Sequence, residues 1–327
     1  MGDQGIPLGA PLTPHSNSTS STPEFSAVIA CYYEEQSIDE FYTRLSRTLE
    51  STGRSYEIVL VNDGSTDQTF ERLRSIFAKD SHVSVIVDFF RNAGQACAMA
   101  AGMAEARGRH FIFIDSDLQL DPEELPQLLA EFDKGADIVT GWRKERHDSF
   151  FRTIPSKLAN AIMRKASRHN LRDFGCTFKI VHGDLIRAFN CGPFNILSLV
   201  DVIARAQRIA EVPVTHHARK YGKSGYTFRK LFLSNMDNVV RLSEEPFQIL
   251  GVVCLALGAL FCLRIMVEML SPFSIIGNIT NGLILNILVV AFLVTLAALA
   301  AIGEYVIRSF VHLQRTPHYI IREIHRK

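Results

Sequence analysis

The sequence carries almost no net charge, no closely paired cysteines and a single tryptophan. Its formal net charge is only +1 over 327 residues, so overall electrostatics do not predict a nucleic-acid partner. The six cysteines include no C-x-x-C pair, and a reduced, cytosolic environment accounts for them most simply. His216 and His217 have no partner at zinc-ligand spacing, so we expect them to be structural or at the surface. No G-x-G-x-x-G turn is present, so a dinucleotide-binding Rossmann enzyme would lack its phosphate-binding turn.

The N-terminal residues 1–24 lack an apolar segment of the kind that signal peptides contain. They are rich in Pro, Ser, Thr and Gly, and this composition predicts a disordered tail. We therefore expect the folded part of the chain to begin at Phe25.

Two C-terminal stretches lack charged residues altogether. The cleaner one, Leu283–Gly303, is long enough to cross a bilayer core, which takes about 20 residues. The other, Phe247–Leu263, reaches that length only if it continues past Arg264 and Glu268. These two charges stand near one end, where pairing or snorkelling lowers their cost. Two such stretches in succession favour a pair of transmembrane helices with a short external loop, within 247–308, over buried core helices.

The residues that flank these stretches predict an orientation in the membrane. The connecting loop 271–282 has no Lys or Arg, whereas the segment 309–327 is basic. By the positive-inside rule, an integral membrane protein with both termini in the cytoplasm is expected, and 309–327 would be a cytoplasmic tail. Residues 229–246 place apolar side chains at helical intervals among basic ones, which predicts an amphipathic helix at the membrane interface.

Between the tail and this helix, apolar strands alternate with helical patterns. Strands are predicted at 25–30, 56–61, 83–87, 111–114 and 138–140. The helix at 37–51 is expected to begin with a capping box formed by Ser37 and Glu40. This alternation predicts an α/β fold with a mostly parallel sheet, and ligands of such sheets bind at the carboxyl ends of the strands.

Polar clusters stand at those strand ends. Asp115 and Asp117 end an apolar strand, and two carboxylates there suit Mg²⁺ or Mn²⁺, which could hold substrate phosphates. An ordinary turn is the alternative. Asp63 follows the second strand and could accept from a nucleobase N–H, with Tyr32 or Tyr33 stacked on the ring. A turn that caps the next helix is the alternative for Asp63.

Several motifs in order resemble those of the family 2, GT-A fold glycosyltransferases. These motifs are residues 30–35, 62–67, 91–95 and 115–119. Residues 219–226, 303–305 and 315–319, with the two apolar stretches, narrow the resemblance to polyprenyl-phosphate glycosyltransferases. That group includes dolichol-phosphate mannose synthases, bactoprenol glucosyltransferases and undecaprenyl-phosphate formamido-arabinose transferases. The resemblance runs from Phe25 to the C-terminus and implies a GT-A domain over 25–228.

The resemblance implies an inverting transfer of a sugar from a nucleotide donor, preferably a UDP-sugar, to polyprenyl phosphate. The implied donor-binding residues are Ala30, Tyr32, Glu34, Asp63, Asn92, Gln95 and Asp115. The implied ligands of Mg²⁺ or Mn²⁺ are Asp115, Asp117 and Gln119. The residues implied at the acceptor phosphate are Arg143, Arg219 and Ser224. Members of the group also suggest a homo-oligomer, a tetramer.

Two positions depart from the family pattern. Ala30 stands where proline is usual, and Cys176 replaces the second acid of an Asp-x-Gly-Asp motif, as in the formamido-arabinose transferases. This leaves Asp173 as the candidate catalytic acid near the reacting centre. The alternative for Asp173 is a position at the start of a helix or an ion pair with Arg172 or the basic stretch 143–168. A phosphate monoester has a second pKa of about 6, so its nucleophilic oxygen is already largely unprotonated at neutral pH. The acceptor therefore does not require a general base.

Three other functions compete with this interpretation. A processive polysaccharide synthase would need a Gln-x-x-Arg-Trp motif, but the only tryptophan, Trp142, lies in Gly-Trp-Arg. A catalytically silent, nucleotide-sugar-binding membrane scaffold is disfavoured by the acidic residues at the strand ends. A transporter of the lipid-linked product would need more than two spans per chain.

Overall fold

The structure is a computed structural model that describes most of the predicted catalytic domain and the C-terminus. The described residues are 22–144, 164, 169–189, 191–197, 199–218, 220–221, scattered positions between 287 and 309, and 317–327. The predicted amphipathic helix, the first predicted span, Arg219 and Ser224 lie outside them, as does the predicted tail up to residue 21.

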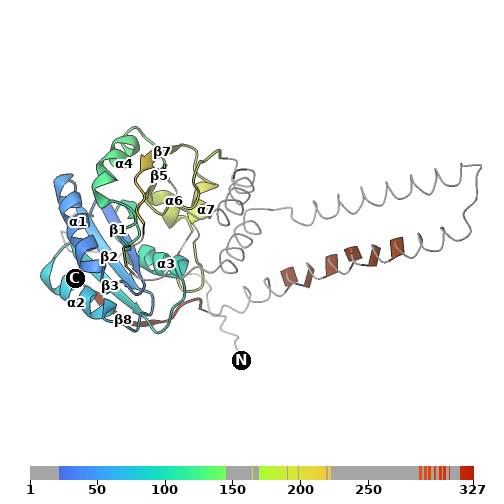
Figure 1. Cartoon of the computed structure of the whole chain (residues 1–327), viewed down its shortest axis with the longest axis horizontal. Helices are drawn as coiled ribbons and strands as arrows, with labels where there is room; N and C mark the ends of the chain where they lie inside the picture. Colours follow the sequence, from blue (N-terminus) through green and yellow to red (C-terminus); the bar gives the residue numbers. More distant parts are fainter. Residues whose placement is uncertain are drawn as a thin grey trace, which may run out of the picture.

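The described residues form one eight-stranded sheet with helices on both faces (Figure 1). The strands are β1 (Phe25–Cys31), β2 (Tyr56–Asn62), β3 (Val83–Phe89), β4 (His110–Phe113), β5 (Ile138–Arg143), β6 (Lys179–His182), β7 (Ile209–Val214) and β8 (Ile321–Arg326). Their order across the sheet is β7-β5-β6-β4-β1-β2-β3-β8. Strands β1 to β5 and β7 run in one direction, and β6 and β8 are antiparallel to their neighbours. The prediction of a mostly parallel α/β sheet is therefore confirmed.

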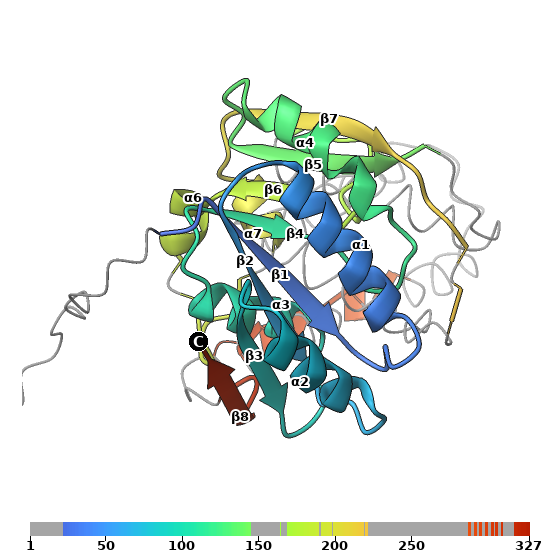
Figure 2. The same cartoon turned by 90° about the vertical axis from the view of Figure 1, so that its left-hand side faces the viewer.

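Helices pack on each face of the sheet around a separate apolar core. The helices are α1 (Ile38–Ser51), α2 (Thr69–Lys79), α3 (Gln95–Glu105), a 3-10 turn η1 (Pro122–Glu124), α4 (Leu125–Phe132), α6 (Gly183–Arg187) and α7 (Leu199–Ile203). The side chains of α1, α2 and α4 share one core, whereas those of α3, α6 and α7 share the other. Figure 2 shows α1 and α2 lying across the sheet. The described sheet therefore carries a layer of helices on each face.

All five strands predicted from the sequence are present as β1 to β5, with bounds that differ by at most three residues. β1, β2 and β3 are buried along almost their whole lengths, and such strands appear in a sequence as continuous apolar runs. The small residues of α3 serve close packing on β1, because a Cβ added at Gly102 would come within 2.4 Å of Val28 Cγ1. The predicted capping box of α1 is wrong. No side chain caps that helix, and the Ser37 hydroxyl donates to the carboxylate of Glu34 instead.

The C-terminal residues form an edge strand that the sequence did not predict. β8 pairs with β3, so residues 321–326 of the predicted tail belong to the central sheet (Figure 2). The ring of Tyr319 stacks on Phe89 with 4.7 Å between ring centroids. Arg322 Nη1 lies 3.1 Å from Asp88 Oδ2. These contacts tie the end of the chain to the strand that precedes Asn92 and Gln95.

Within the part of the chain that the structure describes, no helix is both long and apolar enough to cross a membrane. The second predicted span, 283–303, is described only at scattered positions, which are helical.

Candidate active site

The carboxyl ends of the five strands β1 to β5, which run in one direction, bring most of the predicted site residues to one edge of the sheet. β1 and β2 pair in register, so that Ala30 lies opposite Val61 and Cys31 opposite Asn62. The Ser116 hydroxyl donates to the Ala30 carbonyl at 3.2 Å, which joins the end of β4 to the end of β1. The residues that follow β1, β2 and β4 are therefore neighbours in space.

Asp63 fastens the loop after β3 to the end of β2. Its carboxylate accepts from the Ala93 N–H at 2.7 Å, the Gly94 N–H at 3.0 Å and Asn92 Nδ2 at 2.8 Å. Only 3% of Asp63 is exposed. Burial raises the pKa of Asp63 to about 6, although the two backbone N–H groups act in the opposite direction. The structure thus brings Asp63 and Asn92 together, as predicted, and assigns the carboxylate a structural task as well.

The loop after β2 passes so close to the loop after β3 that it requires glycine. Gly64 has a φ of +66°, and a Cβ there would lie 2.3 Å from the Arg91 carbonyl carbon. Any side chain at this position would push the two loops apart, together with the residues that Asp63 holds.

Two tyrosines stand at the mouth of this part of the site. Tyr32 is 41% exposed, and its ring centroid lies 4.5 Å from that of Tyr33. Tyr33 has a φ of 57° and is tied to the loop after β2, with its hydroxyl 2.9 Å from Thr66 Oγ1. Both rings are exposed to a ligand, Tyr33 at 48%, and Tyr33 is also fixed by the loop after β2.

Asp115 lies between two neutral donors. Gln95 Nε2 donates to Oδ1 at 2.5 Å, and Thr177 Oγ1 donates to Oδ2 at 2.6 Å. Burial and the nearby charge of Asp117 raise the pKa of Asp115 to about 6. Gln95 and Asp115, which were both predicted to bind the donor, are therefore in direct contact.

The predicted metal ligands Asp117 and Gln119 lie in one loop after β4 and contact each other. Asp117 Oδ1 accepts from the Gln119 N–H at 3.1 Å. Gln119 Nε2 donates to the His217 carbonyl at 3.2 Å, which turns the amide oxygen of Gln119 away from His217. The described residues contain no group of three His, Cys, Asp or Glu that could hold a metal ion by themselves. Two carboxylates and one amide oxygen suit Mg²⁺ or Mn²⁺, which commonly take further ligands from substrate phosphates.

Arg143 and Asp173 form a buried ion pair at the end of β5. Arg143 Nε lies 2.7 Å from Asp173 Oδ2, and Nη2 lies 3.0 Å from Oδ1. The Gly175 N–H also donates to Oδ1 at 3.0 Å. The ion-pair alternative for Asp173 is therefore present, and its partner is Arg143, the first residue of the basic stretch. The guanidinium of Arg172 lies over the Trp142 ring instead, 4.8 Å from its centroid.

Two further side chains of this cluster were not predicted from the sequence. Thr177 holds Asp115, and Lys179 is only 2% exposed at the start of β6. Burial lowers the pKa of Lys179, while Cys176, Asp173 and Asp115 act in the opposite direction. A lysine inside an otherwise apolar strand is a signal that could have identified it.

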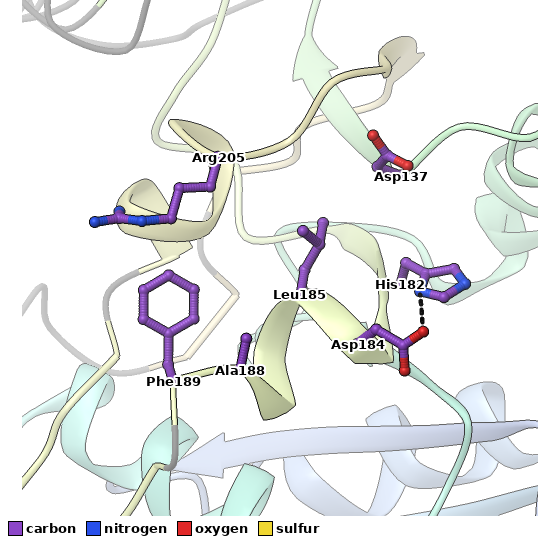
Figure 3. Close-up of a pocket in the computed structure, with 7 residues that line it drawn as sticks. All are labelled: Asp137, His182, Asp184, Leu185, Ala188, Phe189 and Arg205. Carbon is purple, nitrogen blue, oxygen red and sulfur yellow. Dashed lines mark ion pairs between the residues drawn. The ribbon is translucent and has the colours of Figure 1, made fainter.

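A separate surface pocket of about 440 Å³ lies at the opposite edge of the sheet (Figure 3). Asp137 precedes β5, and His182 ends the antiparallel β6, so both mark the edge where β5 begins. The His182 ring faces Asp184 at 3.7 Å, and Arg205 lies over the Phe189 ring. None of the predicted site residues lines this pocket.

Comparisons with known proteins agree with this arrangement. A family model described as "Glycosyl transferase family 2" matches residues 26–191. A dodecaprenyl-phosphate galacturonate synthase from Rhizobium johnstonii is 32% identical over 321 residues, covering 94% of this chain and 95% of that protein. An undecaprenyl-phosphate 4-deoxy-4-formamido-L-arabinose transferase from Edwardsiella ictaluri is 32% identical, with 91% and 93% covered.

A solved structure shares the fold. Glucosyl-3-phosphoglycerate synthase from Mycobacterium tuberculosis, in complex with Mn²⁺, uridine-diphosphate and phosphoglyceric acid, is 19% identical and aligns with a TM-score of 0.52. The alignment covers 68% of this chain and 80% of that one.

Proposed function

Because the chain belongs to glycosyl transferase family 2, we propose that it transfers a sugar from a nucleotide-sugar to polyprenyl phosphate, with inversion at the anomeric carbon. The observation that carries this proposal is the similarity over more than nine-tenths of both lengths to two enzymes named for polyprenyl-phosphate products. The strand-end cluster supports it, because carboxylates and a buried ion pair lie at one edge of the sheet. UDP as the carrier rests on the family resemblance.

The donor would bind along the ends of β1, β2 and β4. Tyr32 offers an exposed ring on which a base can stack. Asp63 holds Asn92 beside it and can accept a further hydrogen bond from a base N–H, because each carboxylate oxygen accepts more than one. Glu34 stands on the same loop as Tyr32, where the resemblance places ribose and base contacts.

Asp115, Asp117 and Gln119 would hold Mg²⁺ or Mn²⁺ on the donor diphosphate. When bound, such an ion neutralises charge that develops on the leaving group. The chain's own contribution is to place two carboxylates and an amide at the end of one strand. Gln95 and Thr177 fix the direction of the Asp115 carboxylate, and the Gln119 N–H donates to Asp117.

The acceptor phosphate would bind beside Arg143. A guanidinium matches phosphate geometry well, and Asp173 fixes its orientation through two bonds. The nucleophilic phosphate oxygen is already largely unprotonated at neutral pH. Asp173 therefore acts on the acceptor by holding Arg143, without accepting a proton from it. Arg219 and Ser224 are proposed to complete this site.

We also propose that the protein is an integral membrane enzyme with its catalytic domain and both termini in the cytoplasm. Two spans within 247–308 and an interfacial helix at 229–246 would anchor it. Strand β8 pairs with β3, so the chain returns after the proposed spans to the sheet that it left. This return supports an even number of membrane crossings between β7 and β8. At described helical positions, Leu288, Phe292 and Leu299 are about 60% exposed or more, as side chains that face lipid would be.

A sugar-transfer assay tests the function directly. Purified full-length protein with Mn²⁺ is given polyprenyl phosphate and a panel of labelled nucleotide-sugars, and lipid-linked sugar is measured. We expect one donor to give product. Nucleotide-sugar binding without product from any donor would favour the silent scaffold. Crosslinking of the same preparation would test the predicted tetramer.

A variant of one proposed metal ligand tests the metal dependence. Asp117→Ala should abolish Mn²⁺-dependent binding of UDP and lower product formation by about 10³-fold or more, because it removes a metal ligand from the diphosphate site. The protein should stay folded in the membrane. Unchanged donor affinity would make 115–117 an ordinary turn.

A further inference from the structure

The segment after β7 is bound to the loop that carries the proposed metal ligands. The His217 N–H donates to the Gln119 carbonyl at 2.9 Å, and Gln119 Nε2 donates back to the His217 carbonyl at 3.2 Å. Leu120 and His216 form an antiparallel bridge beside them. The main chain and the side chain of Gln119 are thus both held by one residue that is distant in sequence.

The ring of His217 is held in turn by Asp121. His217 Nε2 lies 2.7 Å from Asp121 Oδ2, and Arg44 Nη2 lies 2.5 Å from Asp121 Oδ1. Two residues earlier, the Thr215 N–H and hydroxyl both donate to the Glu124 carboxylate. The segment is therefore pinned at two points to the residues around η1, and its backbone has little freedom to shift.

The consequence concerns the direction of the Gln119 amide. Rotation of the Gln119 side-chain amide could exchange the positions of its oxygen and its nitrogen. The hydrogen bond from Nε2 to the His217 carbonyl fixes the nitrogen on the side of His217. The amide oxygen is left on the side away from His217. Groups that orient a metal ligand in this way commonly change metal affinity 10- to 100-fold when they are removed.

We propose that His217, fixed by Asp121, is a positioning residue that holds the Gln119 amide oxygen in the orientation required of a metal ligand. This inference rests on the proposed function, because it takes Gln119 to be a ligand of Mg²⁺ or Mn²⁺. It goes further in assigning a role to a histidine and an aspartate that the metal itself would not touch.

The test measures Mn²⁺ binding to the full-length protein in the presence of UDP, by titration calorimetry and by the Mn²⁺ paramagnetic resonance signal. His217→Ala removes the ring that Asp121 holds and should raise the apparent Kd for Mn²⁺ by about 10-fold or more. His217→Gln can still donate to Asp121, so it should restore most of the affinity. Neither readout depends on turnover.

His182→Ala is the matched control. His182 is also paired with an aspartate and has a comparably exposed side chain, 41% against 50% for His217, but it lies at the opposite edge of the sheet. We expect its Mn²⁺ affinity to equal that of the wild type. An unchanged Kd in His217→Ala, or an equal loss in His182→Ala, would overturn the inference. Should His217→Ala fail to fold, weak Mn²⁺ binding by a folded His217→Gln would overturn it.

The two proposals fail in different ways. If the wild-type protein binds no Mn²⁺ in the presence of UDP, the proposed metal-dependent function is wrong. If the wild type binds Mn²⁺ and His217→Ala binds it equally well, only the positioning role is wrong.

Discussion

Two buried carboxylates of the candidate site, one in each half of the sheet, are held by different means. In the half built from β1 to β4, neutral groups of Asn92, Ala93 and Gly94 hold Asp63. In the half built from β5 to β7, the guanidinium of Arg143 holds Asp173 through two bonds. Neutral hydrogen-bond donors lower the pKa of a buried carboxylate less than a cation does. Burial therefore still raises the pKa of Asp63 to about 6.

This difference matches the ligands that each half would meet. The first half offers carboxylates that retain acceptor capacity for N–H groups or for a cation. The second offers a cation whose direction is set before any ligand arrives, together with the buried Lys179. Hence we place the donor on the first half and the acceptor phosphate on the second.

The largest effect on this comparison of the two halves is expected from Asp173→Asn, which removes the charge that orients Arg143. Turnover should fall by about 10²-fold, because a displaced guanidinium no longer meets the acceptor phosphate in the required geometry. Between pH 6 and 8 the pH profile should keep its shape, because Asp173 transfers no proton. Product formation against pH, with saturating donor, is the measurement.

Glu211→Gln is the control for this variant. Glu211 lies in the same half of the sheet, and its carboxylate accepts only from the Arg172 N–H at 2.8 Å among its recorded hydrogen bonds. It should keep nearly full turnover. A change in the pH profile of Asp173→Asn would show that Asp173 acts as a base, and activity within tenfold of the wild type would exclude both roles.

The next effect is a dependence of stability on pH that arises from Asp63. Its pKa is about 6 in the folded protein against 3.8 ordinarily, so the folded state binds the proton more tightly. The stabilisation from this group is complete below about pH 4, is lost as the pH rises to 6, and stays lost above that. About two pKa units correspond to roughly 3 kcal/mol.

Denaturant unfolding at several pH values measures this dependence. Asp115 titrates in the same range, so the contribution of Asp63 is the difference in slope between wild type and Asp63→Asn. If the free energy of unfolding changed equally with pH in the two proteins between pH 4 and 6, the raised pKa of Asp63 would be contradicted.

The smallest effect concerns the edge of the first half, which β8 covers. Arg322→Met leaves the carboxylate of Asp88, 1% exposed, with Asn62 as its recorded donor. We expect the free energy of unfolding to fall by about 1–2 kcal/mol, since the Arg322 side chain itself is half exposed.

Arg326→Met provides the comparison on the same strand. Arg326 pairs with Glu105, and both side chains are more exposed than Asp88, so the loss should stay below about 1 kcal/mol. Equal losses in the two variants would mean that Asp88 gains nothing specific from Arg322.

Most of the first half could be predicted from the sequence. Its strands are buried runs of apolar residues, and polar residues follow each run directly, so the proximity of Asp63, Asn92 and Asp115 follows from parallel strands ending at one edge. The membrane spans and the residues Arg219 and Ser224 remain predictions, because they lie outside the described residues.

The second half of the sheet and the edge strand β8 depend on pairing between segments that are distant in the sequence. β8 joins a strand more than two hundred residues earlier in the chain, and β6 inserts antiparallel between β4 and β5. No local pattern specifies such partners, because the free energy comes from surfaces that meet only after folding. The pair of Arg143 with Asp173 and the hold of His217 on Gln119 depend on the same encounters.

The sequence by itself determined the α/β class, the parallel strands and the set of acidic residues at their ends, since the apolar pattern of a strand and the residues that follow it are local properties of the chain. Only the tertiary structure decided which group holds each of those acids. A carboxylate takes its pKa and its direction from neighbours that other strands supply.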